Sequence, residues 1–114
     1  MMNLTAIIEA LNLTVLTKPR SFDDVVPANG YTSDLLSCVM AGAKNKGLWV
    51  TLQAHLNIVA VAALLELSAV IITEGAVPDP ATIVKANDQG VTLLATKAPT
   101  FEVVGKLWEM GLHS

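Results

Sequence analysis

Residues 48–73, LWVTLQAHLNIVAVAALLELSAVIIT, constrain the fold more than any other part of the chain. The stretch opens with the short apolar run LWVTL, passes a polar corner, continues as the alanine- and leucine-rich run NIVAVAALLEL, and closes on AVIIT. Short apolar runs rich in β-branched residues predict buried strands, whereas a longer apolar run of alanine and leucine predicts a helix. We therefore predict strands over 48–52 and 69–73 with a helix over 57–67 between them, which is the unit from which parallel sheets are built.

The same alternation of strands and helices continues on both sides of this unit. Asp79 followed by Pro80 is a strong helix start, and Thr32 or Ser33 and Thr100 are candidate caps for two other helices. Further helices are expected over 4–13, 33–43, 79–89 and 101–110, strands over 14–17 and 91–95, and a short extended piece over 24–28. Three successive strand–helix units predict a single α/β domain over 1–114, with a mostly parallel sheet flanked by helices.

An apolar composition raises the alternative of a membrane protein, since 53% of the residues are hydrophobic and only 15% are charged. The most apolar run, residues 56–72, nevertheless contains Asn57 and Glu66. A spanning helix needs about 20 mostly apolar residues, and a carboxylate near its centre costs about 2.5–3.5 kcal/mol. The N-terminal segment lacks a basic region and carries Glu9, and the lone Cys38 fits a reducing compartment. We therefore expect no membrane span, no signal peptide and a cytoplasmic location.

The balance of charge disfavours nucleic acid as a partner. Seven Lys and Arg residues stand against ten Asp and Glu residues, giving a formal net charge of −3 with no basic cluster. Binding to a phosphate backbone needs concentrated positive charge. We therefore expect no nucleic-acid partner.

Polar side chains gather where the predicted strands end. In open α/β sheets, ligands bind beyond the carboxyl ends of the strands, where loops lead into helix N-termini. The candidate ligand-binding residues at these ends are Gln53, His55, Asn57, Thr73, Glu74, Gly75, Thr96 and Lys97. A structural role is the alternative for several of them: Asn57 as a helix cap, His55 as the partner of a nearby carbonyl, and Gly75 as a turn residue.

Sequence signatures of the common enzyme classes are missing. The glycines and lysines of AGAKNKG, residues 41–47, do not have the spacing of a phosphate-binding loop, and no G-x-G-x-x-G follows a strand. One cysteine and two histidines make a structural zinc site a poor hypothesis. Catalysis would rest on His55 and Glu74 as acid and base. We therefore expect a protein that is not an enzyme and has no metal or cofactor, with a nucleotide as the ligand to test.

The helix predicted over 57–67 is apolar on nearly all sides, with Glu66 as its only charge. A helix that covers one face of a sheet needs only one apolar stripe. The second side predicts a homodimer or a docked partner, and the face expected to make that contact comprises Val59, Ala60, Ala62 and Ala63.

Three pieces of the chain, SDLLSCVMA, WVTLQAHLNIVAVA and FEVVGKLWEMG, carry a family resemblance. Across residues 22–112 the sequence resembles the DRTGG domain, and most closely the short stand-alone branch of that family. The resemblance implies an α/β regulatory and dimerising module, like those N-terminal in HPr kinase and between CBS domains in some regulated pyrophosphatases. The stand-alone branch occurs beside hydrogenase and redox-complex components, which implies a redox-complex protein as a partner.

The residues that give the family its name are only partly matched. The acidic–basic pair falls on Ala54 and His55, and the threonine–glycine–glycine piece falls on Thr73, Glu74 and Gly75. A cation is lost and an anion is gained, which disfavours phosphate binding by the family's route. The leading hypothesis is a dimeric regulatory or adaptor domain that senses a small polar ligand or nucleotide at its strand ends. The alternatives are a protein-interaction module without a ligand and a small enzyme.

Overall fold

The computed structural model describes residues 2–114 and places all the strands found there in one sheet, in the order β1–β5–β4–β3–β2. The strands are β1 (Thr14–Val15), β2 (Gly30–Thr32), β3 (Leu48–Thr51), β4 (Ala69–Ile72) and β5 (Leu93–Ala95). β2 to β5 run parallel to one another, and β1 pairs antiparallel with β5 at one edge. The predicted α/β class with a mostly parallel sheet is confirmed.

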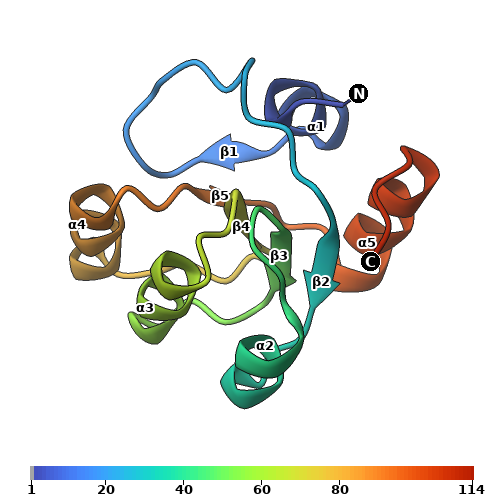
Figure 1. Ribbon diagram of the computed structural model, residues 1–114. Helices are drawn as coiled ribbons and strands as arrows, with labels where there is room; N and C mark the ends of the chain where they lie inside the picture. Colours follow the sequence, from blue (N-terminus) through green and yellow to red (C-terminus); the bar gives the residue numbers. More distant parts are fainter. Residues whose placement is uncertain (1) are drawn as a thin grey trace.

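Helices cover both faces of the sheet (Figure 1). One face carries α2 (Leu36–Gly42), α3 (Asn57–Leu64) and α4 (Pro80–Gln89), and the other carries α1 (Leu4–Leu11) and α5 (Thr100–Glu109). α2, α3 and α4 each connect two neighbouring parallel strands. Right-handed crossovers that proceed in one direction across a sheet place their helices on the same face.

The central strands β3 and β4 are buried along their whole length and supply two separate cores. Neighbouring side chains of a strand point to opposite faces. Leu48 and Val50 therefore pack with α1 and α5, while Trp49 packs with α2 and α3. This double burial explains why the two strands read as continuous apolar runs in the sequence.

The extended piece expected over 24–28 lies outside the sheet, and the edge strand is β2, which was not predicted. Two predicted caps need correction. Thr32 lies in that strand and caps nothing. The Ser33 hydroxyl instead accepts a 3.1 Å hydrogen bond from the Leu35 amide in a local turn. Helix α2 therefore starts without a side-chain cap.

The outer edge of β2 is contacted by the C-terminal segment. The Gly30 amide donates a 2.9 Å hydrogen bond to the carbonyl of His113. Gly111 has a φ of +100° and turns the chain back after α5, which brings the tail onto the strand. The His113 carbonyl thus satisfies the outward-facing amide of an edge strand. The sequence analysis had given His113 no role.

The long apolar run seen in the sequence is divided between two elements. α3 takes eight residues of it and β4 takes four more, with a turn between them. Within residues 2–114, none of the helices combines the length and the apolar character that crossing a membrane requires.

Candidate functional site

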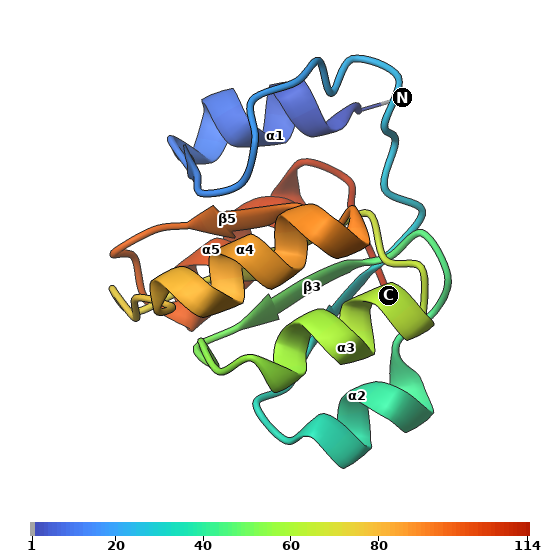
Figure 2. The same ribbon diagram turned by 90° about the vertical axis from the view of Figure 1, so that its left-hand side faces the viewer.

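The predicted site residues lie at one end of the sheet, in a band that we call the strand-end rim (residues 51–57, 73–79 and 96–100). In Figure 2 the carboxyl end of β3 and the first turns of α3 and α4 lie together at the left-hand edge. Each segment of the rim connects a parallel strand to a helix on one of the two faces. The topology thus places the rim where open α/β sheets bind ligands.

Asp34 organises the β3 segment of the rim from a neighbouring loop. One carboxylate oxygen accepts hydrogen bonds from the Thr51 hydroxyl at 2.8 Å and from the Leu52 amide at 2.9 Å. The Gln53 side chain donates to the Asp34 carbonyl at 3.1 Å. Sequence reasoning included Asp34 only as part of the helix predicted over 33–43 and missed this role, because the contact depends on how β2 and β3 pair.

His55 caps α3, and the Asn57 side chain does not. The ring Nδ1 of His55 accepts a 3.1 Å hydrogen bond from the Asn57 amide, and the N-cap residue Leu56 makes no side-chain bond. Because Nδ1 is an acceptor here, the assigned tautomer of a neutral ring carries its proton on Nε2. The cap predicted at Asn57 was wrong, because Leu56 is the N-cap residue and Asn57 is already the first residue of α3.

Glu74 caps a helix that lies 26 residues further along the chain. Its carboxylate accepts a 2.8 Å hydrogen bond from the amide of Thr100, the first residue of α5. The hydroxyls of Thr73 and Thr100 lie 2.6 Å apart beside this bond. The cap predicted at Thr100 was therefore wrong, since α5 begins after Pro99 and its first amide is satisfied by Glu74.

The turn after β4 holds the rest of the β4 and β5 segments together. Glu74 and Gly75 both have positive φ, 61° and 72°, and their amides donate to the carbonyls of Ala98 and Thr96. The Thr96 hydroxyl accepts from the Ala98 amide, and the Lys97 side chain lies against Gly75. The structure therefore brings together all five predicted residues of these two segments.

Asp79 caps α4 as predicted and also lies near His55. Its carboxylate accepts hydrogen bonds from the Thr82 amide at 2.9 Å and the Thr82 hydroxyl at 3.0 Å. The bond from the Thr82 amide is the main cause that holds the pKa of Asp79 below its usual value, followed by the bond from the Thr82 hydroxyl.

Carboxylates hold the backbone donors that an anion would use at this rim. Asp34 accepts from a backbone amide at the end of β3, and Asp79 and Glu74 accept from amides in the first turns of α4 and α5. An incoming phosphate would compete with these internal acceptors and would meet their negative charge. The rim is therefore better suited to a neutral or cationic group than to a phosphate.

Other features of the rim are structural in the same way. Across residues 2–114, each buried side-chain nitrogen or oxygen has a hydrogen-bond partner, so no orphaned polar atom points to a missing ligand. The same residues contain no group of three histidine, cysteine, aspartate or glutamate side chains placed to hold a metal ion. The three hollows described on the surface are lined by residues outside the rim.

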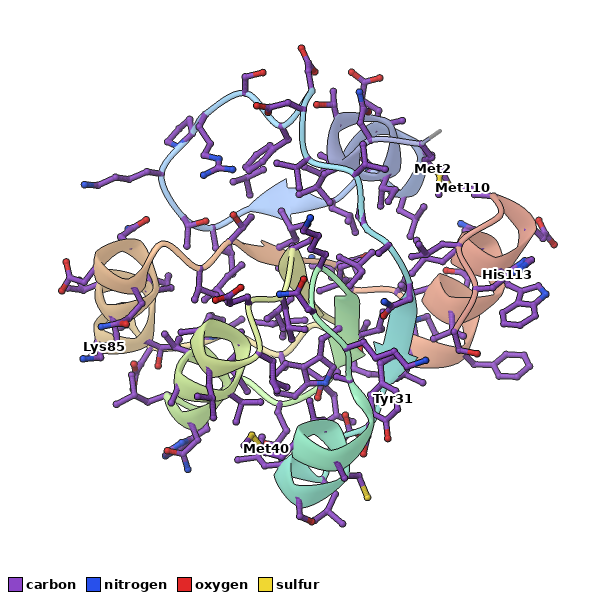
Figure 3. All side chains as sticks on the ribbon, viewed as in Figure 1. Met2, Tyr31, Met40, Lys85, Met110 and His113 are labelled. Carbon is purple, nitrogen blue, oxygen red and sulfur yellow. The ribbon has the colours of Figure 1, made fainter. Side chains whose placement is uncertain are left out.

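Of the four residues expected to form a partner face, two are buried and two are accessible to solvent. Val59 and Ala62 are buried in the core beneath α3, whereas Ala60 is exposed and Ala63 is half-buried. Ala60 and Ala63 line a hollow of about 470 Å³ between α3 and α4, which Leu64, Lys85 and Gln89 complete. Figure 3 labels Lys85 on α4, at the outer side of the molecule.

Comparisons with known proteins support the fold. No family model matches the sequence, and no curated protein matches it. A similar solved structure is that of the CBS and DRTGG domains of the regulatory region of Clostridium perfringens pyrophosphatase, complexed with the activator diadenosine tetraphosphate. The TM-score is 0.70 at 16% sequence identity, over 90% of this chain and 44% of that chain. The chain thus shares its fold with a protein segment that contains a DRTGG domain, and it spans less than half of that segment.

Proposed function

We propose that the chain is a non-catalytic regulatory domain of the DRTGG kind that acts through contacts with other proteins, in the cytoplasm. The arrangement of Asp34, Glu74 and Asp79 carries the proposal, because these side chains use the ligand-binding end of the fold to cap the chain's own backbone. The shared fold with a regulatory region supports the same role. The rim is then a structural feature, and regulation operates through the helical faces.

A catalytic role for His55 and Glu74 is disfavoured by their hydrogen bonds. The His55 Nδ1 accepts from the Asn57 amide, and the Glu74 carboxylate accepts from the Thr100 amide. A general base needs a free lone pair within reach of its substrate. The lone pair of a neutral His55 ring is engaged in holding a helix start, and none of the three described hollows is lined by His55 or Glu74.

The hollow between α3 and α4 is the surface we assign to a protein partner of a redox complex. Ala60 and Ala63 leave room for close approach, and Leu64, which is 68% exposed, offers an apolar side chain to a partner. Titration calorimetry with purified hydrogenase-associated subunits tests this assignment. Ala63→Arg should abolish binding, while Val77→Arg, at an exposed position in the loop before α4 that does not line the hollow, should not.

A small-ligand sensor is the second candidate, because Gln53, His55 and Lys97 all present polar groups at the rim. The solved regulatory region holds diadenosine tetraphosphate, a nucleotide activator. Because the carboxylates of Asp34, Glu74 and Asp79 place negative charge at the rim, a ligand of this chain would bind there through an uncharged or cationic part.

Thermal unfolding with a ligand panel separates these two readings. The panel contains inorganic phosphate, ATP, diadenosine tetraphosphate and adenosine, with His55→Ala as the matched variant. We expect no shift in Tm with any of them, whereas a ligand at about 100 times its Kd adds roughly 2.7 kcal/mol and several degrees. A shift that is lost in His55→Ala would replace the proposal with a sensor at the rim.

A further inference from the structure

Helix α5 carries a second apolar stripe that its own fold does not bury. Val103 and Leu107 face the core, with 2% and 4% of their surfaces exposed. On the opposite side, Phe101 is 91% exposed and Trp108 is 55% exposed, with the half-buried Val104 between them. Spacings of three, four and seven residues place Phe101, Val104, Gly105 and Trp108 along one side of a helix, which we call the outer stripe. Two aromatic rings exposed on one helix are typical of an interaction surface.

Gly105 lies in the middle of the outer stripe, and this chain's own structure does not require a glycine there. A Cβ added to it would meet nothing within 4 Å, and its φ is not in the left-handed region. Glycine in a helix interior is nonetheless less favourable than alanine. A glycine on an exposed apolar stripe allows another backbone to approach closely. The monomer leaves Gly105 unexplained, and a docked helix explains it.

We propose that the outer stripe binds the same stripe of a second copy of this chain, with the two α5 helices antiparallel. A two-fold axis near Val104 and Gly105 places Phe101 of each copy opposite Trp108 of the other, and brings the two glycines together. The same operation brings Glu102 of each copy close to Lys106 of the other. These two opposite-charge pairs favour the antiparallel, isologous arrangement.

A hollow of about 260 Å³ beside the outer stripe gives the second copy further contact. It lies between α5 and the edge strand β2, and its lining includes Val104 and Trp108 of the stripe together with Thr32, Val50 and Leu112. The Trp108 ring stacks on His113, with ring centroids 4.1 Å apart. Figure 3 labels His113 beside α5. The stacked rings form one wall of an apolar recess that faces the proposed partner.

Sedimentation of the full chain over a range of concentrations tests the proposal. We expect a dimer for the wild type, and a dimer Kd raised at least tenfold by Phe101→Glu. Leu64→Glu is the matched control, because Leu64 is a large exposed apolar residue on the α3–α4 face. A wild-type monomer at every concentration would overturn the proposal. So would a dimer that survives Phe101→Glu and dissociates with Leu64→Glu.

Mixing two variants tests the antiparallel register. In F101E or W108K alone, each self-pairing loses both aromatic contacts. A mixed dimer of F101E with W108K keeps one Phe101–Trp108 contact and gains one ion pair, but only if the helices are antiparallel. We expect the mixture to dimerise more tightly than either variant alone. No gain on mixing would rule out this register.

Circular dichroism of each variant confirms folding, which neither substitution should disturb at such exposed positions. The outcome is independent of the ligand panel at the strand-end rim.

Discussion

At the scale of single residues, charged and polar side chains in this protein act mainly on its own backbone. Asp34, Glu74 and Asp79 each accept a backbone amide at the end of a strand or the start of a helix. His55 does the same with a ring nitrogen. A backbone amide without a partner is costly to bury or to leave at a crowded turn. Two of the residues predicted to bind a ligand, His55 and Glu74, therefore also hold the turns themselves.

The cap at Asp79 predicts a pH dependence of stability. The folded-state pKa of Asp79 lies below its usual value of 3.8, so the unfolded chain binds its proton first as the pH falls. The cap therefore contributes fully at pH values above the unfolded-state pKa, and its contribution is lost as the pH falls through the folded-state pKa. We expect Asp79→Ala to lower Tm at pH 7, and the difference from wild type to shrink below pH 3.8. Calorimetric scans of both proteins across this range check it. An equal difference at pH 2.5 and pH 7 would contradict the assignment of the effect to the carboxylate.

At the scale of elements, single residues decide where helices begin and how closely they can pack. α4 begins with a local cap from Asp79, whereas α5 begins with a cap from Glu74, which belongs to the turn after β4. A helix that is capped from another element has its start fixed to that element. The two kinds of cap leave different traces in the sequence, since only the local cap lies next to its helix.

Glu74 has two opposing effects that substitutions can separate. Its carboxylate caps α5, but its φ of 61° is unfavourable for any residue with a Cβ. We expect Glu74→Ala to lower the free energy of unfolding by about 1 kcal/mol through loss of the cap. Glu74→Gly should cost less, because glycine relieves the backbone conformation. Glu74→Gln, which keeps an acceptor, should lie closest to wild type. Urea unfolding of the three variants tests this order, and a glycine variant less stable than the alanine variant would contradict it.

Replacing glycine with alanine should have opposite effects on stability at two positions. A Cβ at Gly47 would lie 2.8 Å from the backbone oxygen of Lys44, so Gly47→Ala should destabilise the chain by about 1–3 kcal/mol. Gly105→Ala meets no atom within 4 Å and should stabilise the isolated monomer by about 0.5–1 kcal/mol. The same Gly105→Ala change should weaken the proposed α5 dimer. Unfolding at concentrations below the dimer Kd, together with sedimentation, checks both effects. A destabilised monomer would show that Gly105 serves its own fold.

At the scale of the whole molecule, two apolar cores on opposite faces of one sheet depend on β3, which contributes to both. Trp49 is fully buried among α2 and α3, and its ring N–H donates to the Ser33 carbonyl at 3.0 Å. Trp49→Phe should therefore leave a cavity and an unpaired carbonyl, and lower the free energy of unfolding by about 2–4 kcal/mol. Trp108→Phe, on the exposed outer stripe, should change it by less than about 0.5 kcal/mol. Guanidinium unfolding of dilute protein, followed by circular dichroism, compares the two. Similar losses in both variants would contradict this division between core and surface.

How far the sequence predicted the structure depended on the range of the interactions involved. β3 and β4 were predicted because residues buried on both faces form continuous apolar runs. β2 was missed because three residues at a sheet edge, starting with Gly30, carry no apolar pattern. At the site, the cap by Asp79 was predicted from its neighbour Pro80, as the signal is local. The roles of Asp34 and Glu74 were not, since their partners lie 18 and 26 residues away and meet them only after the sheet has formed.

The bond between the Gly30 amide and the His113 carbonyl has a consequence for solubility. An uncovered strand at the edge of a sheet is a template on which strands of other molecules can add, and this is a common route to aggregation. In this protein a few residues of the C-terminal segment cover that edge and also pack Leu112 against Gly30. Removal of residues 112–114 should convert a stable solution into one that scatters light on concentration. We therefore expect the segment after α5 to protect the sheet against edge-to-edge assembly with other copies.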